Sequence, residues 1–266
     1  MRALGIRPKK RFGQHFLVDG AAATRIARLA LEDPGVPVLE IGAGTGALTA
    51  ALVRLGGDVT AFDVDPQMVE ILGSRDDLAA VDVRQADALT FDYAGWAAGR
   101  EWIAAGNLPY NVGTPLLVIL AALPQPPRRV VAMIQKDVAD RLLAKPGTSP
   151  YGSLTVAVGL TMRVSRAFNV PPGAFYPRPG VVSTVVLLDR RDAPAADVRD
   201  RARFEQVVRG AFAYRRKTLA NSLTLALDLP REQIVAAIAS LALNPDVRGE
   251  DLDLRTFAAL TDALAG

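Results

Sequence analysis

From residue 36 onward, short apolar runs alternate with segments whose apolar residues have helical spacing. Runs of four to eight apolar or β-branched residues predict strands, and apolar residues three and four apart predict helices packed on a sheet. The predicted strands are Val36–Ile41, Asp58–Asp63, Val81–Gln85, Glu101–Asn107 and Arg128–Gln135. The predicted helices are Ala47–Leu55, Pro66–Leu72, Pro115–Leu123 and Lys136–Leu143. This alternation predicts an α/β domain, a sheet with helices on both faces.

After residue 143 the sequence pattern differs from the alternation of strands and helices described above. Two apolar, β-branched runs, Leu154–Val164 and Val181–Leu188, predict an antiparallel strand pair that completes the sheet edge. A charged, alanine-rich stretch over 190–201 has no apolar periodicity, which indicates a linker. Beyond it, helices are predicted at Phe204–Tyr214, Thr218–Leu227, Arg231–Leu241 and Leu252–Leu264. We therefore expect a first domain over 1–190 with a basic arm over 1–17, a linker over 191–201, and a small all-α domain over 202–266.

The amino-acid composition excludes several kinds of catalytic and metal-binding site. The chain has 266 residues, half of them apolar, with no cysteine and a single histidine, His15. Thiolate metal sites and disulfides are thereby excluded, a Ser-His-Asp triad is disfavoured, and we expect no metal. No stretch approaches the roughly 18 consecutive apolar residues of a membrane span, and the first 17 residues lack the apolar run of a signal peptide. We expect a soluble cytoplasmic protein that does not bind membranes.

The net charge of +3 is small, but basic residues gather in two acid-free clusters. The clusters include Lys9, Lys10 and Arg11 near the N-terminus and Arg215, Arg216 and Lys217 near the C-terminus. Basic patches of this kind suit a polyanion. Each cluster taken alone is equally compatible with a solvated segment that only aids solubility.

The stretch "VLEIGAGTGALTAAL" places Glu40, Gly42 and Gly44 where the first predicted strand passes into a helix. Glycines there allow a sharp turn and close approach of a ligand to the backbone. The loop alone fits a nicotinamide dinucleotide or S-adenosylmethionine equally well. Asp63 ends the second strand and can hold ribose hydroxyls, and Asp87 after the third can accept from an adenine amino group. Together with Glu40, which can orient the loop or meet a cationic amino group, these acids favour S-adenosylmethionine.

The stretch "NLPY" follows the fourth strand, so Asn107 lies at the same sheet edge as the glycine loop. It contains no nucleophile and no strong base. An adenine 6-amino group needs neither: the Asn107 side-chain oxygen and the Leu108 carbonyl can accept its hydrogens and favour a pyramidal nitrogen. Pro109 restricts the preceding residue, and Tyr110 can stack on the base. The motif therefore predicts catalysis by positioning and dipoles.

A base inside a helix cannot reach such a site, so the target must be unpaired or flipped out. A second aromatic side chain is expected to sandwich it, and Phe175 in "PPGAFYPRP" is our candidate. Core packing is the alternative interpretation of this phenylalanine, and a turn after a buried strand is the alternative interpretation of "NLPY".

Seven ordered motifs across nearly the whole chain resemble the ribosomal RNA adenine dimethyltransferase family, in particular its small-subunit branch. They are "KKRFGQHFL", "LEIGAGTGALT", "QADAL", "NLPYNVGTPLL", "IQKDVADRL", "VPPGAFYPRPGVVSTVV" and "YRRKTLANSL". The resemblance implies a class I, Rossmann-like S-adenosylmethionine-dependent methyltransferase domain with a helical C-terminal domain. It implies dimethylation at N6 of two adjacent adenines in the 3'-terminal hairpin of 16S rRNA, within a small ribosomal subunit or its precursor, with S-adenosylhomocysteine as product.

Residue by residue, the resemblance implies that Gln14, His15, Leu17, Gly42, Asp63, Asp87 and Asn107 contact the methyl donor. It implies that Asn107, Leu108, Pro109, Tyr110 and Phe175 meet the acceptor adenine. It also implies that Arg215, Arg216 and Lys217 face the RNA, and we expect Lys9, Lys10 and Arg11 to bind RNA as well. Two positions depart from the family pattern, because Asp63 and Asp137 stand where glutamate is common. The ribose contact of the shorter Asp63 is expected to be longer or bridged by water.

Three alternatives remain open at this point. A 23S rRNA dimethyltransferase is the nearest, although its motif commonly reads Asn-Ile-Pro-Tyr. A ribosome assembly factor with dispensable catalysis would use the basic clusters equally well but would not need "NLPY". A DNA adenine methyltransferase is disfavoured by Leu108, because those enzymes usually carry a second proline there. We expect the protein to be a monomer.

Overall fold

The computed structural model describes residues 14–109 and 112–265, which divide into two compact units. The first unit comprises Met1–Ala139 and Arg163–Arg190, and the second comprises Asp140–Met162 and Arg191–Gly266. The chain thus passes between the units three times, whereas a single passage near residue 190 was expected from the sequence. The segment 140–162 groups with the second unit because its apolar residues Tyr151, Val156 and Leu160 pack into the core of the C-terminal helices.

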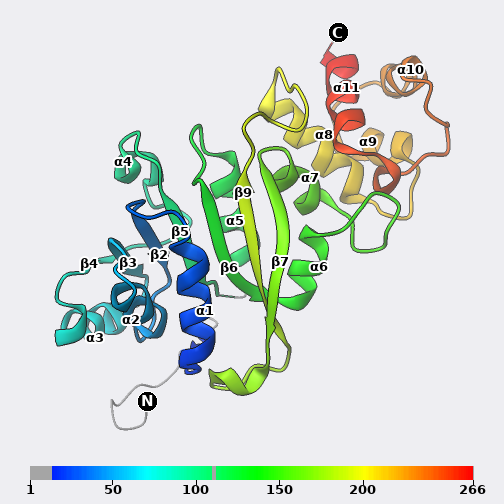
Figure 1. Cartoon of the computed structure of the whole chain (residues 1–266). Coiled ribbons are helices and arrows are strands. Elements are labelled where there is room, and N and C mark those ends of the chain that lie inside the picture. The colour runs from blue at the N-terminus through cyan, green and yellow to red at the C-terminus, as the bar shows by residue number, and fades with distance from the viewer. Residues whose placement is uncertain (1–13, 110–111, 266) are drawn as a thin grey trace. The chain divides into compact units, whose positions relative to one another are not determined.

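The first unit is built on a seven-stranded sheet with the order β4-β3-β2-β5-β6-β9-β7 (Figure 1). Its strands are β2 (Val38–Ile41), β3 (Val59–Asp63), β4 (Asp82–Gln85), β5 (Ile103–Asn107), β6 (Arg129–Gln135), β7 (Met162–Val170) and β9 (Ser183–Arg190). Neighbours from β4 to β6 pair in parallel, and β9 is antiparallel to β6. The five strands predicted from the apolar runs are confirmed, and the structure shows that they pair in parallel.

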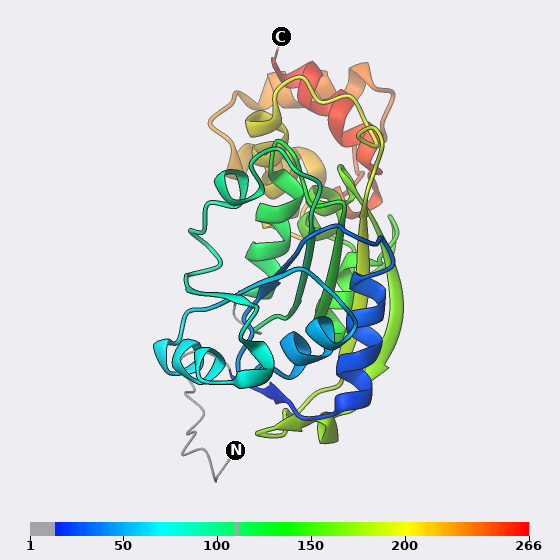
Figure 2. The same cartoon turned by 60° about the vertical axis from the view of Figure 1, so that its left-hand side comes forward.

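Helices cover both faces of this sheet. The helices in this part of the chain are α1 (Gly20–Ala30), α2 (Ala47–Arg54), α3 (Pro66–Gly73), α4 (Tyr93–Ala97), α5 (Gly113–Ala122) and α6 (Lys136–Leu142), and α6 includes the boundary between the two units. Figures 1 and 2 show α1 and α5 on opposite faces of the sheet. The α1 helix shares one core with α2, where fully buried Ile26 and Leu52 lie against Val38 of β2. The predicted layering is therefore confirmed.

The parallel register brings the ends of separate strands to one edge. Ile41 of β2 pairs with Phe62 of β3, and Asp63 pairs with Gln85 of β4. On the other side of β2, β5 runs in the same direction and ends at Asn107. Ligands of open α/β sheets bind at the carboxyl ends of parallel strands. The loops that leave β2, β3, β4 and β5 therefore define the site.

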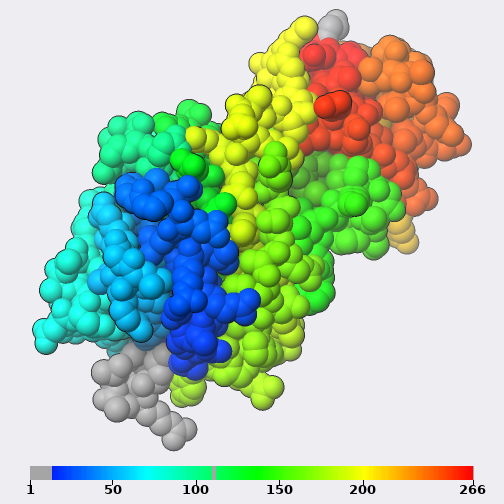
Figure 3. Space-filling view, viewed as in Figure 1, coloured from blue at the N-terminus to red at the C-terminus, as the bar shows by residue number. Residues whose placement is uncertain are grey.

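A second, two-stranded sheet joins residues far apart in the sequence. In it β1 (Phe16–Leu17) is antiparallel to β8 (Phe175–Tyr176), with Leu17 opposite Phe175. The chain then enters α1, whose first turn is capped because the Asp19 side chain accepts from two backbone N–H groups. Neither β1 nor α1 was predicted. Arg25 of α1 lies over the Phe168 ring of β7, 3.7 Å from its centroid, and the two elements form adjoining surfaces in Figure 3.

The prediction of a strand at Leu154–Val164 is wrong over its first half. Residues Ser153–Gly159 form α7, and β7 begins only at Met162. A short run of β-branched residues does not distinguish a buried helix from a strand. Here tertiary packing decides, since Val156 and Leu160 contribute to the helical core.

The second unit is otherwise helical, as predicted. Its C-terminal helices are α8 (Arg201–Ala213), α9 (Leu219–Ala226), α10 (Arg231–Ser240) and α11 (Leu254–Ala265). They enclose fully buried Phe204, Phe257 and Leu260. Within the described residues of both units, no helix combines the length and apolar character needed to cross a membrane.

Candidate active site

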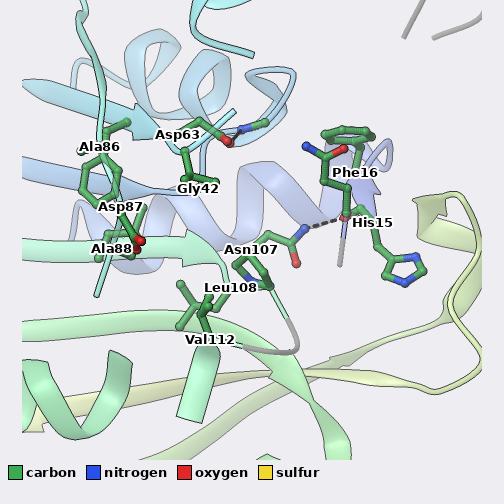
Figure 4. A pocket seen from close by; sticks show the side chains of 16 residues that line it. His15, Phe16, Gly42, Asp63, Ala86, Asp87, Ala88, Asn107, Leu108 and Val112 are labelled. Atoms are coloured by element: carbon green, nitrogen blue, oxygen red, sulfur yellow. Dashed lines mark hydrogen bonds between the residues drawn. The ribbon is translucent and has the colours of Figure 1, made fainter. Parts of the chain in front are cut away.

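A cleft lies at the carboxyl edge of the parallel strands (Figure 4). Several predicted site residues line it together: Gln14, His15, Gly42, Gly44, Asp63, Asp87, Asn107, Leu108 and Pro109. They come from the residues before β1, from the last residues of β3 and β5, and from the loops after β2, β4 and β5. The structure thus brings the glycine loop, the two aspartates and the start of "NLPY" to one place.

The glycine loop needs its glycines for conformation. Gly42, Gly44 and Gly46 all have positive φ, at 72°, 55° and 79°. Only glycine adopts this region without a steric penalty. At Gly44 an added Cβ would also lie 3.0 Å from the ring of Phe16, which packs on the loop. The loop and the β1 segment therefore form one wall of the cleft.

Asp63 holds this loop as well as lining the cleft. Its Oδ2 accepts from the Gly44 N–H at 2.9 Å, and its Oδ1 accepts from the Asp65 N–H at 2.9 Å. Burial raises the pKa of this carboxyl, and the two backbone donors oppose the rise. Each carboxylate oxygen has a second lone pair, so Asp63 can still accept from a ligand hydroxyl. The hydrogen bond from the Gly44 N–H therefore fixes the Asp63 side chain against the glycine loop.

Asp87 occupies the other end of the cleft, between Ala86 and Ala88 (Figure 4). Its Oδ1 accepts from the Leu89 N–H at 2.9 Å, which fixes the carboxylate beside the end of β4. The carboxylate group is therefore oriented before any ligand arrives. Its position suits an acceptor for the amino group of an adenine.

Asn107 is oriented by a hydrogen bond to the β1 segment. Its Nδ2 donates to the carbonyl oxygen of His15 at 2.8 Å, shown as a dashed line in Figure 4. A carbonyl only accepts, so this bond determines which end of the amide is the nitrogen. The Asn107 Oδ1 is thereby turned the other way and can accept. Next to it, the Leu108 N–H donates to the Met133 carbonyl at 3.0 Å and fixes the motif on β6.

His15 itself is held through its ring. Its Nδ1 lies 2.8 Å from the carbonyl oxygen of Pro177, in the segment after β8. Because that oxygen is an acceptor, Nδ1 carries the proton. The ring points away from Asn107 (Figure 4). His15 therefore links the end of β5 to the segment after β8, and the geometry does not use it as a base toward Asn107.

A model of the family described as "Ribosomal RNA adenine dimethylase" matches residues 5–262. The chain belongs to this family. The small subunit methyltransferase A of Desulfitobacterium hafniense is 38% identical over 98% of this chain and 93% of its own length. The fold agrees with two solved structures, each 24% identical to this chain.

The first solved structure is a dimethyladenosine transferase from Plasmodium falciparum, with a TM-score of 0.72 over 92% of this chain and 96% of that one. The second is the 23S rRNA methyltransferase ErmE, with a TM-score of 0.66 over 94% of this chain and 100% of that one. The predicted class I methyltransferase fold is confirmed. At this level of identity the two likenesses speak for fold alone.

Three residues predicted to contact the methyl donor or the acceptor adenine are not among the described residues that line the cleft. Leu17 and Phe175 are 5% and 4% exposed and belong to the main core of the first unit. Glu40 is 2% exposed, within β2, and its Oε2 has no hydrogen-bond partner in the described part of the chain. Because Glu40 is buried and does not line the cleft, its burial favours the predicted role of orienting the loop over a direct contact with the donor.

Burial raises the pKa of Glu40 from 4.5 to about 8. Between these values the folded chain keeps a proton that the unfolded chain releases, so stability falls as pH rises, by up to about 1.4 kcal/mol per pH unit from this group. The Glu40→Gln variant should show a shallower fall. Urea unfolding at several pH values between about 5 and 8 checks this, and equal slopes in both proteins would contradict it.

The Phe175→Ala variant should lower the free energy of unfolding by about 3–5 kcal/mol, because a buried ring is replaced by a cavity. Tyr176→Ala is the matched control: this neighbouring ring is 37% exposed and should cost about 1 kcal/mol or less. Urea unfolding measures both. A Phe175→Ala protein with unchanged stability but lost methyl transfer would instead favour the predicted stacking role.

Only one of the two predicted basic clusters lies within the described residues. Lys9, Lys10 and Arg11, like Tyr110 of the "NLPY" motif, lie outside the described residues. Arg215 forms an ion pair with Glu250 at 3.2 Å and donates to the Ser149 carbonyl, so it supports the second unit internally. Arg216 and Lys217 are exposed on that unit. Their predicted contact with RNA stays a prediction.

Sequence reasoning missed the apolar part of the lining. These residues are Phe16, Ile41, Phe62, Val64, Ala86, Ala88 and Val112. Each lies within five residues of a predicted polar site residue, at a strand end or in the loop after it. The signal that could have found them is this proximity, since an adenosine-sized ligand needs apolar walls as well as polar groups. Within 14–109 and 112–265, no cluster of three or more His, Asp or Glu suited to a metal ion occurs.

Proposed function

We propose that this dimethylase transfers methyl groups from S-adenosylmethionine to N6 of two adjacent adenines in the 3'-terminal hairpin of 16S rRNA. The observation that carries the proposal is the orientation of Asn107, whose Nδ2 is tied to the His15 carbonyl at 2.8 Å. Its Oδ1 is left to accept an amino hydrogen at the edge of the cleft. We infer that the chain acts in the cytoplasm, as a monomer, on a small ribosomal subunit or its precursor.

The cleft fits the proposed donor. The positive-φ glycine loop permits close backbone approach, while Asp63 and Asp87 supply fixed carboxylates at separate points of the same lining. Apolar walls from Phe62 and Ile41 suit an adenosine between them. We infer that Asp63 accepts from the ribose hydroxyls and Asp87 from the adenine amino group. When bound, the donor supplies a sulfonium methyl group, which is already a strong electrophile.

The protein then has to prepare a weak nucleophile. The lone pair of an adenine amino nitrogen is delocalised into the ring. Asn107 Oδ1 and the Leu108 carbonyl would accept the two amino hydrogens and favour a pyramidal nitrogen with its lone pair directed at the methyl group. The nitrogen would gain a methyl group and a positive charge while the carbon–sulfur bond of the donor breaks and leaves S-adenosylhomocysteine, and the nitrogen would then lose a proton to solvent. No strong base is required, because preorganised dipoles orient the amino group and stabilise the developing positive charge.

The acceptor has to leave a helix to reach this edge. An amino group in a paired base is engaged and stacked, so the target adenine must be unpaired or flipped out. We infer that Tyr110 contributes a stacking surface. Pro109 shapes the turn, and its carbonyl accepts from the N–H groups of Val112 and Gly113, which closes the loop onto α5.

The competing hypothesis is that the substrate is 23S rRNA. ErmE, a 23S rRNA methyltransferase, shares the fold at 24% identity, whereas a relative at 38% identity is named as a small subunit methyltransferase. This difference favours the small subunit. An assembly role with dispensable catalysis is the other alternative, and it can coexist with the enzymatic one.

The deciding experiment uses methyl-labelled S-adenosylmethionine with unmethylated small subunits and, in parallel, unmethylated large subunits. Nuclease mapping locates the label, and mass spectrometry identifies the base. Dimethyladenosine at neighbouring positions near the 3' end of 16S rRNA is the expected result. Label in 23S rRNA alone would reassign the substrate, and no label in either RNA despite donor binding would favour the assembly role.

A further inference from the structure

Arg75 lies behind the glycine loop and contacts its backbone. It follows the C-terminal end of α3, and its Nη1 donates to the Thr45 carbonyl at 2.8 Å and to the Gly46 carbonyl at 3.2 Å. Thr45 and Gly46 complete the loop and lead into α2. Arg75 is not one of the described residues that line the cleft, so it meets the loop from its other side.

The guanidinium is held in place by Asp77. Its Nε donates to Asp77 Oδ1 at 3.0 Å and its Nη2 donates to Oδ2 at 2.6 Å. This two-point contact fixes the plane of the guanidinium group. The hydrogen bonds from Arg75 also lower the pKa of Asp77, which favours its carboxylate form. The remaining Nη1 is therefore aimed at the loop rather than free to rotate.

The loop is packed tightly onto this group. A Cβ built at Gly46 would lie 2.9 Å from Arg75 Nη1 and 2.7 Å from Leu72 Cδ2. Gly46 also has a φ of 79°, which a side chain would disfavour. Arg75 and Asp63 thus hold the same loop at two places, one through carbonyl groups and the other through the Gly44 N–H.

We propose that Arg75 is a positioning residue for the methyl-donor site. By binding the carbonyls of Thr45 and Gly46, it keeps Gly42 and Gly44 in the conformation that meets the donor. It touches neither donor nor acceptor. The inference rests on the proposed use of S-adenosylmethionine. Loss of Arg75 therefore weakens donor binding and leaves the methyl transfer step of the saturated enzyme intact.

The chain offers a closely matched control. Arg84 of β4 also pairs with an aspartate two residues away, at 2.6 Å from Asp82, but on the exposed side of an edge strand. Its side chain is 47% exposed, against 29% for Arg75. Exposed pairs of this kind contribute little stability. Arg84→Met therefore removes an equivalent ion pair without touching the glycine loop.

The test measures S-adenosylmethionine binding by calorimetry and steady-state methylation of small subunits. Arg75→Met should raise the donor Kd about tenfold, a size typical of lost hydrogen bonds to a charged group, while kcat at saturating donor stays within about twofold. Arg84→Met should leave both unchanged. Arg75→Lys should fall between, since an ammonium can reach one carbonyl but cannot form the two-point contact with Asp77.

Several results would overturn the inference. One is an equal donor Kd for Arg75→Met, Arg84→Met and wild type. Another is a loss of kcat at saturating donor as large as the loss of kcat/KM. Thermal unfolding without donor shows whether Arg75→Met folds; if it does not, Arg75→Lys carries the same comparison. Wild-type protein that fails to bind S-adenosylmethionine would instead contradict the proposed function.

Discussion

Replacing Asn107 by alanine is expected to lower kcat by about 10²–10³-fold, the range seen when one preorganised polar group is removed from a reacting centre. The change deletes the Oδ1 that would accept the adenine amino hydrogen, and it deletes the hydrogen bond to the His15 carbonyl. Donor binding should change much less, since Asp63, Asp87 and the glycine loop stay in place. Single-turnover methylation at saturating donor measures the chemical step directly.

Asn107→Asp is the informative companion. It keeps an oxygen at the acceptor position but puts a second oxygen against the His15 carbonyl, 2.8 Å from the present nitrogen. Two acceptors repel at that distance, so the side chain should turn away and activity should remain low. An alanine variant with nearly normal kcat would show that Asn107 is not the acceptor. If Asn107→Ala protein lacks methylation yet supports normal subunit maturation, the assembly role is favoured.

Gly106→Ala is expected to lower the free energy of unfolding by about 3 kcal/mol. A Cβ at this position would lie 2.4 Å from the carbonyl oxygen of Ile41 on the neighbouring strand β2. A backbone oxygen inside a sheet cannot rotate aside as a long side chain can. Strand β5 would have to move off β2, and Asn107 is the next residue. Urea unfolding, with methylation measured alongside, tests both consequences.

Gly73→Ala is the control for this substitution. Gly73 ends α3, and an added Cβ there meets nothing within 4 Å. Alanine is favoured over glycine in helices by up to about 1 kcal/mol, so this variant should be as stable as wild type or more so. Equal stability for the two variants would contradict the close approach of β5 to β2.

Much of the site followed from local sequence because its parts lie where strands end. A parallel α/β sheet brings the carboxyl ends of its strands to one edge, so any residue placed just after a strand is placed at the site. Asp63, Asp87 and Asn107 could be assigned to one cleft in this way, and so could the glycine loop, which follows the first predicted strand. The helical C-terminal segment could also be predicted from the sequence, since apolar spacing alone indicates such helices.

Other features depend on partners distant along the chain. Residues 153–159 are helical because they pack with α8, although their β-branched run resembles a strand. Phe175 lies in the core because β8 pairs with β1, more than 150 residues earlier. Arg75 reaches the glycine loop only because α3 ends beside it. Single-sequence patterns report periodicity and turns, but not which distant groups meet.

The sequence by itself therefore determined the α/β class, the five strands, the helical C-terminal segment and the polar residues at strand ends, all of which depend on short-range spacing. Only the tertiary structure decided the orientation of Asn107 by His15, the burial of Glu40 and Phe175, and the support of the glycine loop by Asp63 and Arg75. These depend on hydrogen bonds and packing between segments that approach one another only when the sheet has formed.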